Sequence, residues 1–390
     1  MAEINPFDNA GGRPTWAEIN LDALAANFHI VSDKVGPDVK VMAVVKANAY
    51  GHGAAECARR LEREGAAWFG VALPEEGTEL RAAGVTKPIL CLAGFWGEQA
   101  AACVQQSLVP VVYRLDMIEA FDRAAGERGV VADVHVKVDT GMGRLGVRFD
   151  EVSEFANPLK AFRNIRVDGL MTHFAAADEP SCGMLTLDQI QRFESAVAAF
   201  REHGFEPTHR HLANSAGIFS HPEVFGGESG RVTNMVRPGG VLYGLWRDTL
   251  APEDRDQKFQ PVMSLHSRIT LLKWVPAGET VGYGCTFEAS RKTLVATIPI
   301  GYDDGYMRAL SNRGHAIIRG VYATVIGRIS MDLTLVDVTT VPEVQLDDEV
   351  IFMGQDASLS VTAEDIARTA GTLSYEVTCG IGARVPRIYR

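Results

Sequence analysis

Eight short apolar segments alternate with helical segments through much of the chain, and this alternation limits the possible folds more than any other feature. Strands are expected near residues 40–45, 67–71, 88–92, 109–113, 132–138, 165–172, 209–213 and 232–236. The segments between them mostly have helical character, most clearly residues 186–202, whose apolar side chains share one helix face. Eight repeats of a strand and a helix within about 240 residues are typical of a (β/α)8 TIM-type barrel.

An open, doubly wound parallel sheet is the alternative, because strand order cannot be inferred from a sequence. The Gly-x-Gly-x-x-Gly fingerprint of dinucleotide-binding sheets does not follow the first strand. Residues 139–146 are rich in glycine, but they follow the fifth strand and lack that spacing. The barrel is therefore the preferred prediction.

Local signals predict several helix ends. Asn20 is expected to cap a helix that runs from Leu21 to about Ser32. Gly65 and Gly84 are expected to end two later helices, because glycine readily adopts the left-handed conformation found at helix ends.

The pattern changes after about residue 244. Residues 260–274, 294–300, 315–327 and 333–338 alternate apolar and polar side chains with period two, which predicts an antiparallel β domain. Only residues 362–369 look helical in this part of the chain. The predicted organisation is an N-terminal arm over residues 1–14, a barrel over residues 15–250 and a mostly antiparallel β domain over residues 251–390.

Composition and charge exclude several classes of function. The formal net charge of −11 argues against nucleic acid or an anionic membrane as a partner. No apolar run is long enough to span a membrane, and the N-terminus has no signal-peptide pattern. The six cysteines are far apart without a Cys-x-x-Cys pair, which is typical of reduced thiols. We therefore expect a cytoplasmic protein with neither a metal site nor a disulfide framework.

Lys46 stands where the first expected barrel strand breaks into a turn rich in Asn and Gly. A charged lysine at the end of a buried strand is costly, so Lys46 should be neutral, paired or covalently bound. A lysine with a lowered pKa is what Schiff-base chemistry requires. Tyr50 follows four residues later, within reach of the same pocket.

Polar residues also follow the later strands, and the catalytic groups of such barrels come from the C-terminal strand ends. They are Lys137, Asp139 and Arg144 after the fifth strand, His173 after the sixth, His211, Asn214 and Ser215 after the seventh, and Arg237, Gly239 and Gly240 after the eighth. A hydroxyl and glycine amides after the last two strands suit a phosphate. A Schiff-base lysine opposite a phosphate site indicates pyridoxal 5′-phosphate.

Taken one at a time, such residues are more often structural than catalytic. His173 and Arg237 would usually be polar groups at strand ends, and Tyr283 between two glycines would usually be a turn aromatic. His52 and His211 are interpreted as structural. The functional interpretation depends on several motifs occurring together and in order.

The ordered motifs resemble those of the alanine racemase family, over nearly the whole chain from about residue 15. They are Val45-Lys46-Ala47-Asn48-Ala49-Tyr50-Gly51-His52-Gly53, Lys137-Val-Asp-Thr-Gly-Met-Gly-Arg144-Leu-Gly, Thr172-His173-Phe174-Ala175, Ala213-Asn214-Ser215-Ala216, Met235-Val236-Arg237-Pro238-Gly239, Gly282-Tyr283-Gly284, Pro299-Ile300-Gly301-Tyr302, Ser330-Met331-Asp332 and Ser374-Tyr375-Glu376-Val377.

The resemblance implies a pyridoxal-phosphate-dependent barrel followed by a β domain, working as a head-to-tail homodimer with shared active sites. The implied activity is racemisation of L- and D-alanine, which supplies D-alanine for peptidoglycan in the cell wall. Racemisation needs a base on each face of the substrate plane. By resemblance, Lys46 acts on the D side and Tyr283 of the partner subunit acts on the L side.

The resemblance also implies a cofactor site. The cofactor is expected to contact Tyr50, His173, Asn214, Ser215, Arg237, the amides of Gly239 and Gly240, and Tyr375. The family position that matches Gly240 often holds a bulkier residue. Arg237 is expected to face the pyridine nitrogen and, because a guanidinium only donates, to leave that nitrogen unprotonated. A free tyrosine has a pKa near 10, so a tyrosine that acts as a base needs a cationic or hydrogen-bonding neighbour. His173 and Arg237 resemble the family residues that supply such neighbours.

Substrate contacts are implied in the same way. Arg144 and the main chain of Met331 of the partner subunit are expected to contact the substrate carboxylate, and Tyr302 resembles a residue of the entrance. Lys137 matches a position that is N-carboxylated in some relatives, where the carbamate orients Arg144. Asp332 matches a residue that contacts the site residues and not the substrate itself.

Three alternatives were weighed against alanine racemisation. A racemase of the same fold with broader specificity, acting on serine for example, stays open. A basic amino-acid decarboxylase shares the barrel but needs acidic substrate-binding residues and a catalytic cysteine in motifs that are missing here. A non-enzymatic carrier of the cofactor would be a single barrel, so the β domain with Tyr283 argues against it.

Overall fold

The computed structural model describes residues 12–226 and 232–390. The chain forms two compact units, and each is described by itself. One unit, the barrel unit, contains residues 24–49 and 53–259. The other, the β unit, contains residues 12–23, 50–52 and 260–390 of the described chain.

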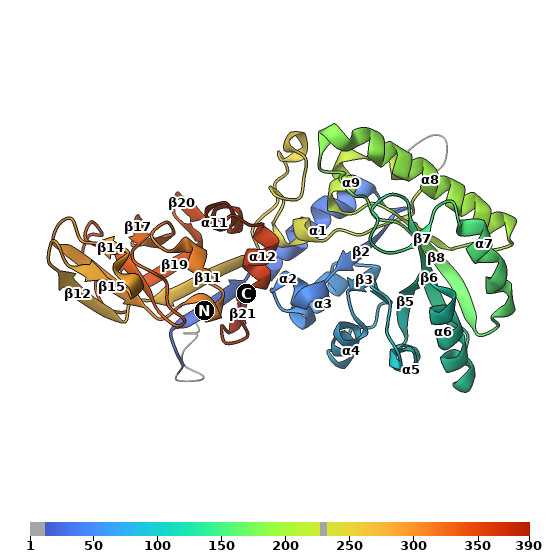
Figure 1. The fold of residues 1–390 in the computed structure, drawn as a ribbon, viewed down its shortest axis with the longest axis horizontal. Helices are drawn as coiled ribbons and strands as arrows, with labels where there is room; N and C mark the ends of the chain where they lie inside the picture. The colour runs from blue at the N-terminus through green and yellow to red at the C-terminus, as the bar shows by residue number, and fades with distance from the viewer. Residues whose placement is uncertain (1–11, 227–231) are drawn as a thin grey trace. The chain divides into compact units, whose positions relative to one another are not determined.

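Parallel strands form the centre of the barrel unit (Figure 1). They are β2 (Lys40–Val44), β3 (Trp68–Val71), β4 (Ile89–Cys91), β5 (Leu108–Val112), β6 (Ala132–Asp139), β8 (Ile165–Met171), β9 (His209–His211) and β10 (Met235–Val236), in the order β10-β2-β3-β4-β5-β6-β8-β9. A short strand, β7 (Val147–Arg148), pairs with β6. A parallel bridge between Asn214 and Arg237 joins the two ends of the sheet, so the barrel is nearly closed.

This closure confirms the predicted barrel, and all eight predicted strands are present. The open sheet is excluded, because its end strands would not pair. The interior is packed with buried apolar side chains, among them the cluster Met42, Trp68, Leu90, Val109, Val111, Met171 and Met235. Burial of parallel strands on both faces explains why β3, β4 and β5 are apolar throughout in the sequence.

Helices surround the strands of this unit (Figure 1). They are α1 (Leu21–Val35), α3 (Ala54–Arg63), α4 (Pro74–Ala82), α5 (Gln99–Gln105), α6 (Leu115–Glu127), α7 (Val152–Ala156), α8 (Gly183–Glu202), α9 (Ser215–Ser220) and α10 (Glu223–Gly226). Oδ1 of Asn20 accepts from the amide of Ala23 at 2.8 Å, which confirms the predicted cap of α1. Gly65 and Gly84 have φ of 103° and 86° directly after α3 and α4, as predicted.

The β unit is built on one large sheet, confirming the predicted antiparallel β domain. Its strands are β1 (Thr15–Ile19), β11 (Met263–Arg268), β12 (Leu271–Val275), β15 (Thr293–Ile298), β16 (His315–Ile318), β17 (Val321–Val325), β18 (Thr334–Asp337), β19 (Glu349–Asp356), β20 (Leu359–Val361) and β21 (Arg387–Tyr389), in the order β12-β15-β18-β17-β16-β19-β11-β1-β21 with β20 on β19. All pairs are antiparallel except β1 with β21. A separate hairpin joins β13 (Thr280–Val281) and β14 (Phe287–Glu288).

The start of the chain differs from its expected place. The predicted limits put residues from 15 onward with the barrel, whereas β1 pairs with β11 and β21 in the β unit. Both partners lie far away in the sequence, so no local pattern could assign β1 to them. The predicted arm over residues 1–14 falls mainly outside the described residues.

Two helices belong to the end of the chain. The predicted helix is α11 (Ala363–Ala370), which Thr362 caps by accepting from the amide of Asp365 at 3.1 Å. The expectation that this is the only helix of the domain is wrong, because α12 (Ser374–Cys379) follows. α12 has six residues and no side-chain cap, so it carries too little periodicity to be detected. None of the helices in the described ranges is long and apolar enough to cross a membrane.

Candidate active site

Lys46 begins a left-handed turn directly after β2. All four residues that follow it in α2 (Lys46–Tyr50) have φ between 52° and 54°. L-amino acids avoid this conformation, which costs about 1–2 kcal/mol per residue. The strain therefore lies next to the predicted catalytic lysine, and strained backbone is typical of functional sites.

Hydrogen bonds within the barrel unit hold this turn. The amide of Ala47 donates to Oε1 of Glu76 at 2.6 Å, while Oε2 of Glu76 accepts from two amides ahead of α4. Oδ1 of Asn48 accepts from the amide of Ala54 at 2.8 Å. Sequence analysis missed Glu76, whose only local signal is an acidic residue in the first turn of α4.

Tyr50 and Tyr375 lie next to each other in the β unit, with ring centroids 5.6 Å apart. Burial and the neighbouring Tyr375 raise the pKa of Tyr50, so its phenol stays protonated at neutral pH and can donate. Gly51 permits a close approach to α12, because a Cβ there would lie 2.1 Å from the carbonyl oxygen of Thr378. Two predicted cofactor-binding phenols thus come together.

The Lys137 side chain is buried in β6 without a hydrogen bond or ion pair to any described residue. Burial, followed by the charges of Arg237 and Arg144, lowers the pKa of Lys137 to about 8. The charge of Lys46 acts on Lys137 in the same direction. Four predicted cationic residues therefore share one environment, which favours an anionic ligand.

Arg144 lies in the exposed loop between β6 and β7, and its guanidinium contacts no hydrogen-bonding or acidic partner among the described residues. Oδ1 of Asp139 shapes this loop by accepting from the amides of Gly141 and Gly143, each at 3.0 Å. A cavity of about 350 Å³ beside the loop is lined by Asp139, Gly141, Gly143, Arg148, Phe149 and Arg192. The charge of Arg144 is thus not neutralised by an acidic partner in the described part of the chain.

Arg237 is 3% exposed and directly follows β10. Nη1 donates to Nδ1 of His211 at 2.9 Å and to the carbonyl oxygen of His211 at 2.7 Å. Nη2 donates to the carbonyl oxygen of Thr172 at 2.7 Å and to Nδ1 of His173 at 3.1 Å. The remaining donor, Nε–H, makes no hydrogen bond to a described residue.

These donors fit the predicted cofactor. Burial lowers the pKa of Arg237 to about 9, so the guanidinium is still protonated at neutral pH. A protonated guanidinium cannot accept a hydrogen bond, so its uncommitted Nε–H suits an unprotonated ring nitrogen. Lys46 supplies the amine for an aldehyde. The residues present therefore fit pyridoxal 5′-phosphate: Arg237 suits its ring nitrogen, and Lys46 suits its aldehyde.

Arg237 also fixes the tautomers of His173 and His211. Each ring accepts at Nδ1, so each neutral imidazole carries its proton on Nε2. Burial and the charge of Arg237 hold the pKa of both histidines well below the usual value. His211, interpreted from the sequence as structural, is in fact a direct partner of Arg237.

The predicted phosphate-binding residues mark the starts of two helical turns, α9 (Ser215–Ser220) and η3 (Gly240–Tyr243). Oδ1 of Asn214 accepts from an amide in the first turn of α9 at 3.0 Å. Oγ of Ser215 accepts from the amide of Gly239 at 2.9 Å, which joins the two segments. First-turn amides have no acceptor inside their own helix, so these paired turns offer donors suited to a phosphate.

Tyr283 is 72% exposed in η5 (Tyr283–Cys285), on the loop between β13 and β14. Its neighbours Gly282 and Gly284 have φ of 76° and 71°. A Cβ at Gly284 would lie 2.6 Å from Nη1 of Arg328, which ends a flexible side chain, so the positive φ is the stronger reason for glycine there. The bend therefore holds Tyr283 where another molecule can reach its phenol.

Tyr302, Met331 and Asp332 lie on two bonded loops of the β unit. The amide of Tyr302 donates to the carbonyl oxygen of Ser330 at 3.0 Å. Tyr302 is 41% exposed and Met331 is 50% exposed. Asp332 accepts from Nη2 of Arg384 at 2.6 Å. Sequence analysis missed Arg384, whose acceptors all lie more than fifty residues away in the chain.

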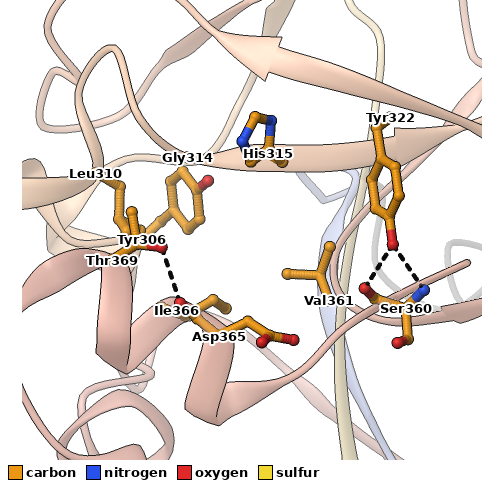
Figure 2. Close-up of a pocket in the computed structure, with 10 residues that line it drawn as sticks. All are labelled: Tyr306, Leu310, Gly314, His315, Tyr322, Ser360, Val361, Asp365, Ile366 and Thr369. Carbon is orange, nitrogen blue, oxygen red and sulfur yellow. Dashed lines mark hydrogen bonds between the residues drawn. The ribbon is translucent and has the colours of Figure 1, made fainter.

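A separate cavity of about 250 Å³ lies within the β unit (Figure 2). It is lined by Tyr306, Leu310, Gly314, His315, Tyr322, Ser360, Val361, Asp365, Ile366 and Thr369. The hydroxyl of Tyr322 bounds one side, donating to the carbonyl oxygen of Ser360 at 2.9 Å and accepting from its amide at 3.2 Å. No predicted site residue lines this cavity, so it is not part of the candidate active site.

Comparison with known proteins gives one consistent result. Residues 19–246 match the family model for the alanine racemase N-terminal domain, and residues 262–389 match that for the C-terminal domain. A curated relative from Halothermothrix orenii, named alanine racemase, is 42% identical over 380 residues, which cover 97% of each chain.

Solved structures agree with this match. The alanine racemase of a D-cycloserine-producing Streptomyces lavendulae is 34% identical, with a TM-score of 0.88 over 97% of each chain. The alanine racemase of Bartonella henselae, described with covalently bound pyridoxal phosphate, is 28% identical, with a TM-score of 0.84 over 97% of this chain and 100% of that one.

Proposed function

The chain belongs to the alanine racemase family and is an isomerase, and from this premise we propose that it interconverts L- and D-alanine with pyridoxal 5′-phosphate. The solved relative with covalently bound pyridoxal phosphate supports this cofactor. The proposed catalytic bases are Lys46 and Tyr283 of the partner subunit, on opposite faces of the substrate.

The environment of Arg237 is the observation that carries this proposal. Arg237 directly follows β10, which pairs with β2, the strand that leads to Lys46. Its Nη groups are committed to acceptors within the barrel, which leaves Nε–H for a ring nitrogen. A guanidinium at that nitrogen makes the ring a weaker electron sink than a carboxylate would, which favours return of the proton over transamination.

The remaining chemistry is divided between the cofactor and the chain. The cofactor, when bound, stabilises the negative charge that develops on the substrate Cα after deprotonation. Lys46 and Tyr283 of the partner subunit remove and return the proton on opposite faces. Nε2–H of His173 is directed away from Arg237 by the tautomer, so it can donate to the phenolic oxygen of Tyr283 of the partner subunit.

The family resemblance assigns the residues that bind the substrate and the phosphate. Arg144, whose charge has no acidic partner among the described residues, binds the carboxylate together with the main chain of Met331 of the partner subunit. Ser215 and the amides of Gly239 and Gly240, with Tyr50 and Tyr375, hold the phosphate. Tyr302 borders the entrance, and Asp332 with Arg384 fixes the loop that carries Met331.

A head-to-tail homodimer is part of the proposal. It fits the exposure of Tyr283, Tyr302 and Met331, which leaves each side chain accessible to a second copy of the chain. Mixing two inactive variants, Lys46→Ala and Tyr283→Phe, tests it. If sites are shared, about half of randomly paired dimers contain one intact site, so co-expression should restore about a quarter of the wild-type activity per chain.

The controls are each variant alone and the mixture of Lys46→Ala with Lys46→Arg, none of which can assemble an intact site. Activity in the test mixture no higher than in these controls would show that Tyr283 does not act across subunits. The same assay with L-serine and larger amino acids measures substrate breadth. Equal rates for alanine and serine would favour the broad-specificity racemase instead.

We further propose that the reaction takes place in the cytoplasm and supplies D-alanine for peptidoglycan. All six cysteines are free thiols, which fits a reducing compartment. Expression of the chain in a bacterium that requires added D-alanine should remove that requirement. The Lys46→Ala variant, expressed to the same level, should not.

A further inference from the structure

Arg237 is a buried cation without a direct counter-ion in the described part of the chain. Its acceptors are carbonyl oxygens and the Nδ1 atoms of His173 and His211, and all of these groups are neutral. The nearby Lys137, as an unmodified amine, is mostly protonated at neutral pH as well. A buried, unpaired charge is costly, so the barrel should contain an acidic group that balances it.

A directed series of contacts leads from Arg237 to such a group. Nη1 of Arg237 donates to Nδ1 of His211, so the proton of this neutral ring is on Nε2. Nε2 of His211 lies 2.8 Å from Nδ1 of His135, which must therefore accept. The proton of His135 is then on Nε2, which lies 3.8 Å from Oδ2 of Asp168 and has no other partner.

Asp168 lies within the barrel on β8 and is 6% exposed. Burial alone would raise the pKa of Asp168, but His135 and the neighbouring His209 and Thr208 lower it to about 2, so the carboxylate is charged at neutral pH. Asp168 is also 3.5 Å from Nε2 of His209 and 3.9 Å from Arg166. The series thus has a negative end at Asp168 and a positive end at Arg237.

The backbone is shaped to place the His135 ring. Gly169 is the β8 partner of His135, and a Cβ at Gly169 would lie 2.6 Å from three atoms of that ring. The register of β6 with β8 shifts between Val134 and His135. The Trp68 ring also packs against His135, with ring centroids 5.2 Å apart. The orientation of the His135 ring is therefore fixed by its close contacts with Gly169 and Trp68.

We propose that His135 and Asp168 are positioning residues for Arg237, with Asp168 as its remote counter-ion. Hydrogen bonds of fixed direction join Arg237, His211 and His135, and the last step to Asp168 is an electrostatic contact of 3.8 Å. The carboxylate polarises both imidazoles, which strengthens the bond that Nδ1 of His211 accepts from Arg237. The guanidinium is then held with Nε–H uncommitted. The inference rests on the proposed function only where Arg237 meets the cofactor ring.

Nitrogen NMR of labelled histidine side chains tests the series directly, on the full-length protein with and without added pyridoxal 5′-phosphate. In the wild type, His211 should be a neutral ring protonated at Nε2, with that proton at low field and slow to exchange. His135→Leu removes the acceptor, so the signal should move upfield and exchange faster. Asp168→Asn should give a smaller upfield shift, because the acceptor is kept and the charge is lost.

Two further variants separate this role from packing. His135→Asn keeps an acceptor near the position of Nδ1 and should recover most of the His211 signal. His209→Leu is the matched control, because His209 also contacts Trp68 and Asp168 but does not bond to His211. It should leave the His211 signal unchanged. In the racemase assay, His135→Leu should lower kcat about tenfold with KM within about twofold, and His209→Leu should change neither beyond about twofold.

An unchanged His211 signal in His135→Leu, or the same change in His209→Leu, would overturn the proposal. The NMR result does not depend on catalysis. A wild type without racemase activity but with the expected His211 signals would refute the proposed function and leave the series intact. An active wild type in which both leucine variants behave alike would refute the series and leave the function intact.

Discussion

At the scale of single residues, the barrel environment changes the protonation and reactivity of the Lys137 amine. Burial and two neighbouring arginines lower its pKa to about 8, so roughly half of its amine is neutral at pH 8. A neutral amine can attack carbon dioxide, forming an N–C bond and releasing a proton. The resulting carbamate is an anion, which Arg144 and Arg237 would stabilise by their charge.

We therefore predict that Lys137 becomes a carbamate in solution. Labelled bicarbonate added at pH 8 should give a carbamate signal by carbon NMR, and Lys137→Arg should abolish it. Lys40→Arg is the control, because Lys40 is exposed. A signal that persists in Lys137→Arg, or that is absent from the wild type, would contradict the prediction.

At the scale of an element, the left-handed turn after β2 is unusual because it contains no glycine until Gly51. Its four strained residues are held by contacts from Glu76 and by the bond that Asn48 accepts from the next helix. The strain is thus balanced by local hydrogen bonds, and its release should be measurable as a gain in stability.

We predict that Ala47→Gly raises the free energy of unfolding by about 0.5–1 kcal/mol, because glycine tolerates φ near 52° although it gains entropy when unfolded. Ala55→Gly, in the right-handed helix α3, should lower it by about 1 kcal/mol. Denaturant unfolding measures both. Equal losses in the two variants would show that the turn stores no strain.

At the scale of the whole molecule, two properties depend on residues that come from several different strands and loops. One is acid sensitivity. His135, His173, His209 and His211 are all buried in the barrel unit, and burial lowers the pKa of each, that of His209 to about 4. The unfolded chain binds a proton at each of these side chains below about pH 6.5, whereas the folded chain binds these protons only at lower pH.

Stability should therefore fall as the pH drops from about 6.5 toward 4, with a loss of about 1 kcal/mol from His209 alone between pH 7 and pH 5.5. Denaturant unfolding at both pH values measures the loss. His209→Asn should reduce the loss of unfolding free energy by about 1 kcal/mol. A free energy of unfolding that is flat over this range would contradict the neutral state of the buried histidines.

The other property is association. If the exposed residues Tyr283, Tyr302 and Met331 meet a second copy, then Met331→Asp should raise the dimer dissociation constant at least about tenfold, because it buries an unpaired charge. Sedimentation measures this. Leu346→Asp is the control, since Leu346 is similarly exposed at 54% but belongs to a different loop. A dimer that is unaffected by Met331→Asp would place the interface elsewhere.

The sequence by itself determined the repeating strand–helix pattern, the change to period two after the barrel, and the residues that follow each strand. These features depend on side chains close together in the chain, as the cap at Asn20 and the closing glycines Gly65 and Gly84 show. The eight barrel strands could be predicted for the same reason, because short apolar segments recur at regular spacing, although β6, β8 and β9 also contain polar or charged residues.

Only the tertiary structure decided the pairing of β1 with β11 and β21, the left-handed turn after Lys46, and the partners of Arg237. His211, interpreted from the sequence as structural, acquires its role from contacts with Arg237 and with His135, which lies seventy-six residues earlier. Such contacts arise because closing a barrel brings the interior faces of distant strands together, and no local pattern records which side chains then meet.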